Sequence, residues 1–175
     1  DLGESCFSFQ YDFVGNILSS RERHGLSAPD VLLSSYLYDD RGRLVSGSYS
    51  LNNGKSATIK YEYDAVGRMK KARYGDEING FDEEYSYGIS GSLLRKESPY
   101  FTMCLRYHAP LINGSTPSWD GNISEWSWHY GPDGSEQTYA FSYDKLSQLM
   151  AVKQYVDGVA NDLFVEKGLS YDKNG

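Results

Sequence analysis

The stretch K-Y-E-Y-D-A-V-G-R-M-K-K-A-R-Y-G at residues 60–75 contains one complete hairpin. Tyr61 and Tyr63 alternate with polar neighbours, and in an extended chain this spacing places both rings on one face. Asp64 and Gly67 then open and close a four-residue segment. Asp at the first position and Gly at the last are typical of a type I turn. The pattern therefore predicts a strand, a tight turn and a returning strand.

Copies of the motif Tyr-Asp-x-x-Gly-Arg-Leu recur along the chain. Their first residues are Tyr11, Tyr38, Tyr63, Tyr87, Tyr143 and Tyr171, of which the last three begin less complete copies. The spacings between them are 27, 25, 24, 56 and 28 residues. Since 56 is twice 28, a further copy is expected in the long interval, and residues 119–123 (W-D-G-N-I) are the candidate.

The residues around each motif predict an all-β fold. A large apolar residue stands two positions before every motif tyrosine: Phe9, Tyr36, Tyr61, Tyr85, Phe141 and Leu169. Asn-Gly or Asp-Gly turns lie between successive motifs, at 52–54, 79–80, 131–134 and 157–158. Each repeat of about 25 residues then holds two antiparallel strands. About a dozen strands would form a strongly curved, spiral or partly closed sheet, because open sheets rarely exceed ~10 strands.

Composition limits the remaining possibilities. The chain has 175 residues, is 39% hydrophobic and carries a net charge of −7, which fits one β domain over residues 1–175 and argues against a nucleic-acid partner. No apolar run reaches ~18 residues, so no membrane-spanning helix is expected. The first residues lack the pattern of a signal peptide. Cys6 and Cys104 are expected to be separate buried thiols, unless the fold brings their Cα atoms within ~7 Å.

The hairpin gives each motif residue a structural role. The aspartates are expected to accept hydrogen bonds from backbone N–H groups of their own turns. The glycines are expected to take a positive φ, and the tyrosines to present a ring to the interior and a hydroxyl that needs a partner. The arginines are placed to cover neighbouring aromatic rings. These turn residues are Asp12, Gly15, Asp39, Gly42, Arg43, Asp64, Gly67, Arg68, Gly91, Asp144 and Asp172, together with the six tyrosines above.

The repeated Tyr-Asp-x-x-Gly-Arg-Leu motif resembles the YD repeat of rearrangement-hotspot (Rhs) proteins over nearly the whole chain. Residues 114–124 (G-S-T-P-S-W-D-G-N-I-S) are also similar to a stretch of Rhs-like proteins of Bacteroidetes-type bacteria. The resemblance implies β-hairpins that wind into a shell around a C-terminal effector, within a longer secreted or cell-surface polypeptide. It implies a scaffold without catalytic activity, whose partners are the rest of the same polypeptide.

Catalytic and metal-binding patterns are weak in this sequence. His24, His108 and His129 show no ligand spacing, and no cofactor motif is present. Adjacent carboxylates at 82–84 alternate faces on a strand, so they are expected to lie on a solvated edge and to guard it against pairing. We therefore expect no enzyme activity, no metal and no cofactor. Exposed edge strands would also allow copies of the chain to associate.

One stretch suggests an alternative, a carbohydrate- or cell-surface-binding module. Trp126, Trp128 and Tyr130 share one face of a predicted strand, with Trp119 just upstream. A row of flat rings is suited to sugar stacking. The structural reading is that these rings continue the aromatic interior, opposite Tyr139 across the turn at 131–134. The exposure of the tryptophans distinguishes the two readings.

Overall fold

A computed structural model describes residues 5–25, 27–50, 54–76 and 78–172. These residues form strands and turns and no helix. The chain divides into two compact units, Asp1–Glu83 and Glu84–Gly175, and each is described by itself. The prediction of an all-β, antiparallel fold of hairpin repeats is confirmed.

The first unit holds six complete strands and the start of a seventh. The strands are β1 (Ser5–Tyr11), β2 (Ile17–His24), β3 (Val31–Tyr38), β4 (Leu44–Ser50), β5 (Ser56–Tyr63) and β6 (Met69–Tyr74), and β7 (Phe81–Tyr87) begins there. From β1 to β6 each strand pairs antiparallel with the next in the chain.

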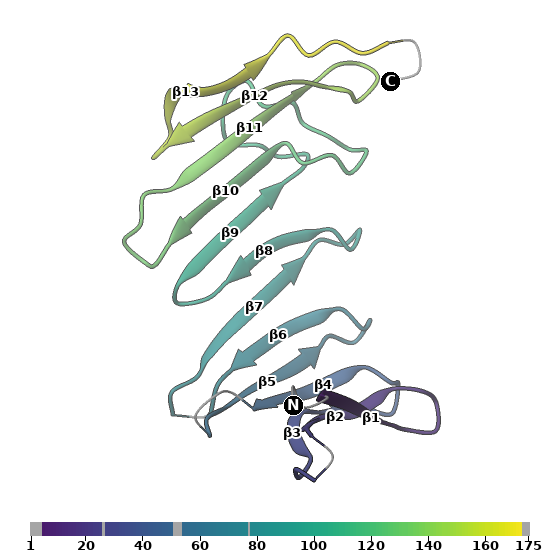
Figure 1. Ribbon diagram of the computed structural model, residues 1–175. Coiled ribbons are helices and arrows are strands. Elements are labelled where there is room, and N and C mark those ends of the chain that lie inside the picture. The colour runs from purple at the N-terminus through teal and green to yellow at the C-terminus, as the bar shows by residue number, and fades with distance from the viewer. Residues whose placement is uncertain (1–4, 26, 51–53, 77, 173–175) are drawn as a thin grey trace. The chain divides into compact units, whose positions relative to one another are not determined.

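The second unit contains the rest of β7 and six further strands. These are β8 (Leu93–Glu97), β9 (Phe101–Arg106), β10 (Glu125–Tyr130), β11 (Gln137–Tyr143), β12 (Leu149–Val156) and β13 (Val159–Lys167). Here too each strand pairs antiparallel with its neighbour in the chain, so the unit is a continuous series of hairpins that Figure 1 shows from teal to yellow.

Every motif hairpin has a β-bulge at the same place. The register shifts by one residue immediately before Tyr11, Tyr38, Tyr63, Tyr87 and Tyr143. In the third motif, for example, Tyr63 lies opposite Met69 while Glu62 lies opposite Lys71, so Lys70 is the extra residue. A bulge bends its strand and increases the local twist. The bulge therefore recurs with the repeat.

The sheet has little enclosed core. Among the described residues, the only hydrophobic side chains that are buried are Ala72 and Ala140. Rings pack beside one another along one face instead, as Tyr36 does against Tyr49 with ring centroids 5.9 Å apart. Burial within this face raises the pKa of Tyr49. The aromatic face is therefore only half-buried within each unit.

The second kind of turn has the predicted tight geometry at 157–158, whereas Asn79, Gly80, Asp133 and Gly134 lack the positive φ that such a turn requires. Asp157 and Gly158 both have positive φ, 49° and 77°, and join β12 directly to β13. This is the geometry of a type I′ turn, whose twist matches that of the strands. The turn predicted at 52–54 lies largely outside the described residues.

Candidate functional site

The second motif shows how each tight turn is held. Asp39 Oδ1 accepts hydrogen bonds from the backbone N–H groups of Arg41 at 3.0 Å and Arg43 at 2.9 Å. Its Oδ2 accepts from Arg43 Nε at 2.8 Å. Gly42 has a φ of 75° and donates its N–H to the Asp39 carbonyl at 3.0 Å. One carboxylate thus binds both the tip and the far side of its own turn.

The other motifs repeat this arrangement with different side chains. The corresponding carboxylate bonds come from Val14 and Asn16 to Asp12, from Val66 and Arg68 to Asp64, and from Leu146 and Gln148 to Asp144. The glycines Gly15, Gly67 and Gly91 have φ of 95°, 93° and 90°. Ser147 stands where the fifth motif lacks its glycine, and it has a φ of 61°. The turn after Asp172 lies outside the described residues.

In three of these turns the hydrogen bonds favour the ionised form of the aspartate, at Asp12, Asp39 and Asp64. The backbone N–H of Arg43 is the main cause that lowers the pKa of Asp39, and the Arg43 side chain adds to it. For Asp12 and Asp64, burial acts in the opposite direction, but bonds from Asn16 and Arg68 respectively outweigh it and lower the pKa. The turns after Tyr11, Tyr38 and Tyr63 are therefore each built around a charged carboxylate.

The motif tyrosines connect one repeat to the one before it. We call the second residue after the glycine position of a motif turn the exit residue. Tyr38 donates its hydroxyl to the carbonyl of exit residue Ile17 at 3.0 Å, and Tyr63 donates to Leu44 at 2.8 Å. The same inter-repeat bond joins Tyr143 to Ile123, at 2.7 Å, and Tyr171 to Leu149, at 2.7 Å. The ring packs at the sheet, and the hydroxyl fixes the distance between successive hairpins.

The further copy expected between Tyr87 and Tyr143 begins at a different residue from the one predicted. Tyr107 donates its hydroxyl to exit residue Leu93 at 2.9 Å, which makes it the missing repeat tyrosine. Trp119 does not take that place, although Ile123 is an exit residue as the candidate segment suggested. The turn between Tyr107 and Ile123 is replaced by a long insertion. A large apolar residue two positions before the tyrosine, Leu105, is the sequence signal that could have found it.

Arg43 links its own turn to the next motif. Its guanidinium carbon lies 4.4 Å from the centroid of the Tyr63 ring, while its nitrogens hold Asp39. This is the geometry of a cation–π contact. Arg43 Nη1 also lies 3.6 Å from the position that a Cβ on Gly67 would occupy. The side chain therefore spans from one turn to the next within the first unit.

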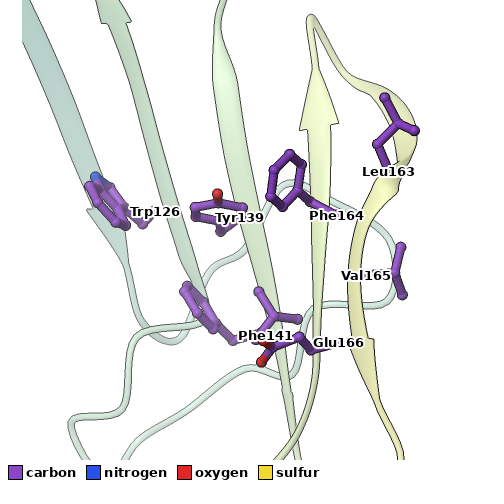
Figure 2. Close-up of a pocket in the computed structure, with 8 residues that line it drawn as sticks. Trp126, Tyr139, Phe141, Leu163, Phe164, Val165 and Glu166 are labelled. Carbon is purple, nitrogen blue, oxygen red and sulfur yellow. The ribbon is translucent and has the colours of Figure 1, made fainter.

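In the second unit the aromatic face lines a groove of about 520 Å³. Trp126 packs against Trp128 at 4.7 Å between centroids and against Tyr139 at 6.0 Å. Phe164 and Glu166 of β13 border the same groove, and Figure 2 shows Phe164 on the side of Tyr139. Trp126 and Trp128 are half-buried. Their mutual packing agrees with the reading in which they continue the aromatic face.

The four aromatic residues proposed for binding do not form one surface. Tyr130 is 70% exposed and packs on Phe101, with centroids 5.4 Å apart. Trp119 is 80% exposed, lies in the insertion and stacks on His108 with centroids 4.6 Å apart. Trp119 therefore belongs to a different site from Trp126 and Trp128.

Two further predictions about single residues are wrong. Cys6 and Cys104 are separate free thiols, as expected, but the prediction that they are buried is wrong, since Cys6 is exposed and Cys104 is only half-buried. The acidic stretch does not guard an edge: Asp82 forms ion pairs with Lys71 at 2.6 Å and Arg73 at 2.8 Å. Glu83 is buried, and Tyr74 on β6 donates its hydroxyl to Glu83 Oε1 at 3.4 Å.

Other candidate chemistry is sparse in the part of the chain that the structure describes. The histidines lie apart: His24 contacts Ser5, His108 contacts Trp119, and His129 Nδ1 lies 2.6 Å from the carbonyl oxygen of Gly131. No cluster of three or more His, Cys, Asp or Glu side chains suited to a metal is found among these residues. The same residues include no helix that is long and apolar enough to cross a membrane.

Comparison with known proteins identifies the fold. No family model and no curated protein matches the sequence. The solved structure of TcdB2-TccC3-TEV matches 90% of this chain with a TM-score of 0.62 at 12% identity. That of TcdB2-TccC3-Cdc42 matches 91% with a TM-score of 0.59, also at 12% identity. This chain spans 8% of the length of each matched chain.

The chain therefore has the fold found within these toxin-complex structures. This fold agrees with the resemblance of the sequence to YD-repeat proteins. At 12% identity the likeness concerns the fold of the hairpin array and carries no activity with it.

Proposed function

We propose that this chain is a non-catalytic wall segment of a secreted or cell-surface YD-repeat protein, whose shell encloses or presents an effector. The observation that carries the proposal is the inter-repeat bond. Five repeat tyrosines, in tight and enlarged turns alike, bind the exit carbonyl of the preceding repeat. A sheet whose recurring contacts join each repeat to the one before it is suited to building a surface.

The half-buried aromatic face supports the same role. A sheet that stood alone would be expected to cover its rings with a second layer, since burying one such ring contributes roughly 1.5–3 kcal/mol. In each unit the rings remain partly open. In the proposed wall, the interior of the shell lies on this side, and the opposite side faces the solvent.

Two adjacent residues of β12 offer a test of this polarity. Gln154 lies opposite Tyr139 in the register and so shares the aromatic face, whereas Lys153 lies opposite Ala140 on the other face. Single cysteines introduced by Gln154→Cys and Lys153→Cys would lie on opposite faces of the sheet but at neighbouring positions of the same strand. Both are made with Cys6 and Cys104 replaced by serine.

The experiment compares the rate of labelling by a maleimide carrying a polyethylene glycol chain. In the full-length polypeptide that contains this chain, we expect the cysteine at 153 to be labelled and the cysteine at 154 to be protected. In the isolated 175-residue chain both are expected to react, which controls for intrinsic reactivity. Equal labelling of both positions in the full-length polypeptide would overturn the proposed wall.

The alternative function, recognition of a carbohydrate or cell surface, is no longer supported as a single aromatic row. Trp126 and Trp128 are occupied with each other and with Tyr139. Trp119 is the exposed tryptophan of the three, and Tyr130, which is also exposed, packs on Phe101 instead. A binding role for this chain therefore has to be argued from the insertion alone.

A further inference from the structure

The insertion between Tyr107 and Ile123 is an ordered loop that the tight turns do not require. In the other motif turns, only three residues separate the two residues that pair at the base of the turn. In the second motif, for example, the backbone N–H of Asp39 donates to the carbonyl of Arg43 at 2.9 Å. In repeat proteins, insertions within one repeat commonly map to loops of a binding face. The question is what this loop holds in place.

A buried carboxylate fixes the loop to the sheet. The side chain of Glu125 on β10 is 0% exposed. Its Oε2 accepts the backbone N–H of Leu111 at 2.9 Å, and its Oε1 accepts the hydroxyl of Ser115 at 2.9 Å. Arg106 lies 3.6 Å away and compensates the charge. A carboxylate buried with this many partners gives the loop one defined conformation.

The loop presents a pair of stacked rings to the solvent. His108 and Trp119 lie with their ring planes 22° apart and their centroids at 4.6 Å. His108 covers one face of the indole, yet Trp119 is still 80% exposed, so the other face of the indole is open. The indole thus offers a flat, amphipathic surface of the kind that is enriched at contact sites.

The rings border a groove of about 700 Å³ that carries polar groups. The same groove is lined by the tight turn that contains Ser90 and Ser92, whose hydroxyl oxygens are 3.1 Å apart. Asp120 lies beside Trp119 and accepts a hydrogen bond from Ser147 at 2.6 Å. The groove thus combines a flat apolar surface with hydroxyl groups and one oriented carboxylate.

We propose that this groove binds a neutral sugar, with the open face of Trp119 stacked on the apolar face of the pyranose ring. Sugar hydroxyls would exchange hydrogen bonds with Ser90, Ser92 and Asp120. An anionic ligand is disfavoured, because the groove holds a carboxylate and no lysine or arginine. The site goes beyond the proposed wall role, which stands whether or not the groove binds sugar.

The test is a glycan array of neutral oligosaccharides, followed by NMR titration of the indole N–H signals with a sugar that binds. We expect the Trp119 signal to shift and those of Trp126 and Trp128 to stay in place. Trp119→Ala should weaken binding by about tenfold or more, and Tyr130→Ala, another exposed ring of the same unit, by less than about twofold. Thermal unfolding should be unchanged in both variants.

Three outcomes would overturn the site. The first is an array with no neutral glycan above background. The second is a Trp119→Ala variant that binds as tightly as the wild type. The third is binding that shifts the Trp126 signal instead, which would return the sugar to the aromatic groove beside β13.

Discussion

The tight turn after Tyr38 and the insertion after Tyr107 close the same kind of hairpin with different chemistry. In the first, one partly buried aspartate, Asp39, accepts hydrogen bonds from two backbone N–H groups of a minimal turn. In the second, the fully buried Glu125 binds a long loop. Both hairpins keep the hydroxyl bond from the repeat tyrosine to the preceding exit carbonyl. The tyrosine bond therefore defines the repeat, and the turn can be exchanged.

The largest expected effect on stability comes from removing the buried carboxylate of Glu125, with an exposed glutamate of the same unit as the control. Glu125→Ala leaves the N–H of Leu111 and the charge of Arg106 without their partner, so we expect the free energy of unfolding to fall by about 3 kcal/mol. Glu136→Ala, at an exposed position of the same unit, should change it by less than about 0.5 kcal/mol. Urea denaturation measures both. A mild effect at Glu125 would mean that the insertion does not depend on it.

A second comparison concerns the tyrosine bond in regions with different turns. Tyr63→Phe and Tyr143→Phe each remove a hydroxyl while keeping the ring, and we expect each to cost about 1 kcal/mol. Tyr130→Phe, whose side chain is 70% exposed, is the control and should be nearly neutral. Unequal costs at 63 and 143 would show that the bond depends on the turn it follows.

A smaller effect is expected from the glycine of the tight turn. Gly42 has a φ of 75° and nothing within 4 Å of the position of an added Cβ, so a substitution tests backbone conformation alone. Gly42→Ala should cost about 0.5–1 kcal/mol, because left-handed backbone is unfavourable for alanine and the loss of chain entropy only partly offsets this. Gly42→Asn should cost less, because asparagine tolerates this region. Equal costs would argue against the observed turn.

The smallest effect is a pH dependence specific to the tight turns. Since the pKa of Asp39 is lowered in the folded state, its contribution to stability is present above 3.8, the ordinary value, and is lost as pH falls through the lower folded value. Asp39→Asn removes this titration but keeps an acceptor. The difference in melting temperature between wild type and variant should shrink from pH 7 to pH 3. A difference that is constant or grows on acidification would contradict the ionised turn.

Much of the fold followed from the motif, because alternation and turn residues act locally. The positions of Asp39, Gly42 and Tyr63 are dictated by spacing alone. The recurrent bulge was not predictable in this way. Four of its extra residues are apolar and the fifth is a lysine, so residue type alone does not mark the position: Leu18, Val45, Lys70, Leu94 and Met150. The separation of Trp119 from Trp126 was also hidden, because it depends on Glu125 folding a loop whose contacts are far apart in sequence.

The repeat at Tyr107 tests the central claim most directly, since spacing alone assigned that repeat to Trp119. Urea denaturation of Tyr107→Phe should show a loss of about 1 kcal/mol, equal to that of Tyr63→Phe, because the bond to the Leu93 carbonyl is removed. Trp119→Phe should leave the free energy of unfolding unchanged within about 0.5 kcal/mol. A neutral Tyr107→Phe together with a destabilising Trp119→Phe would contradict the account.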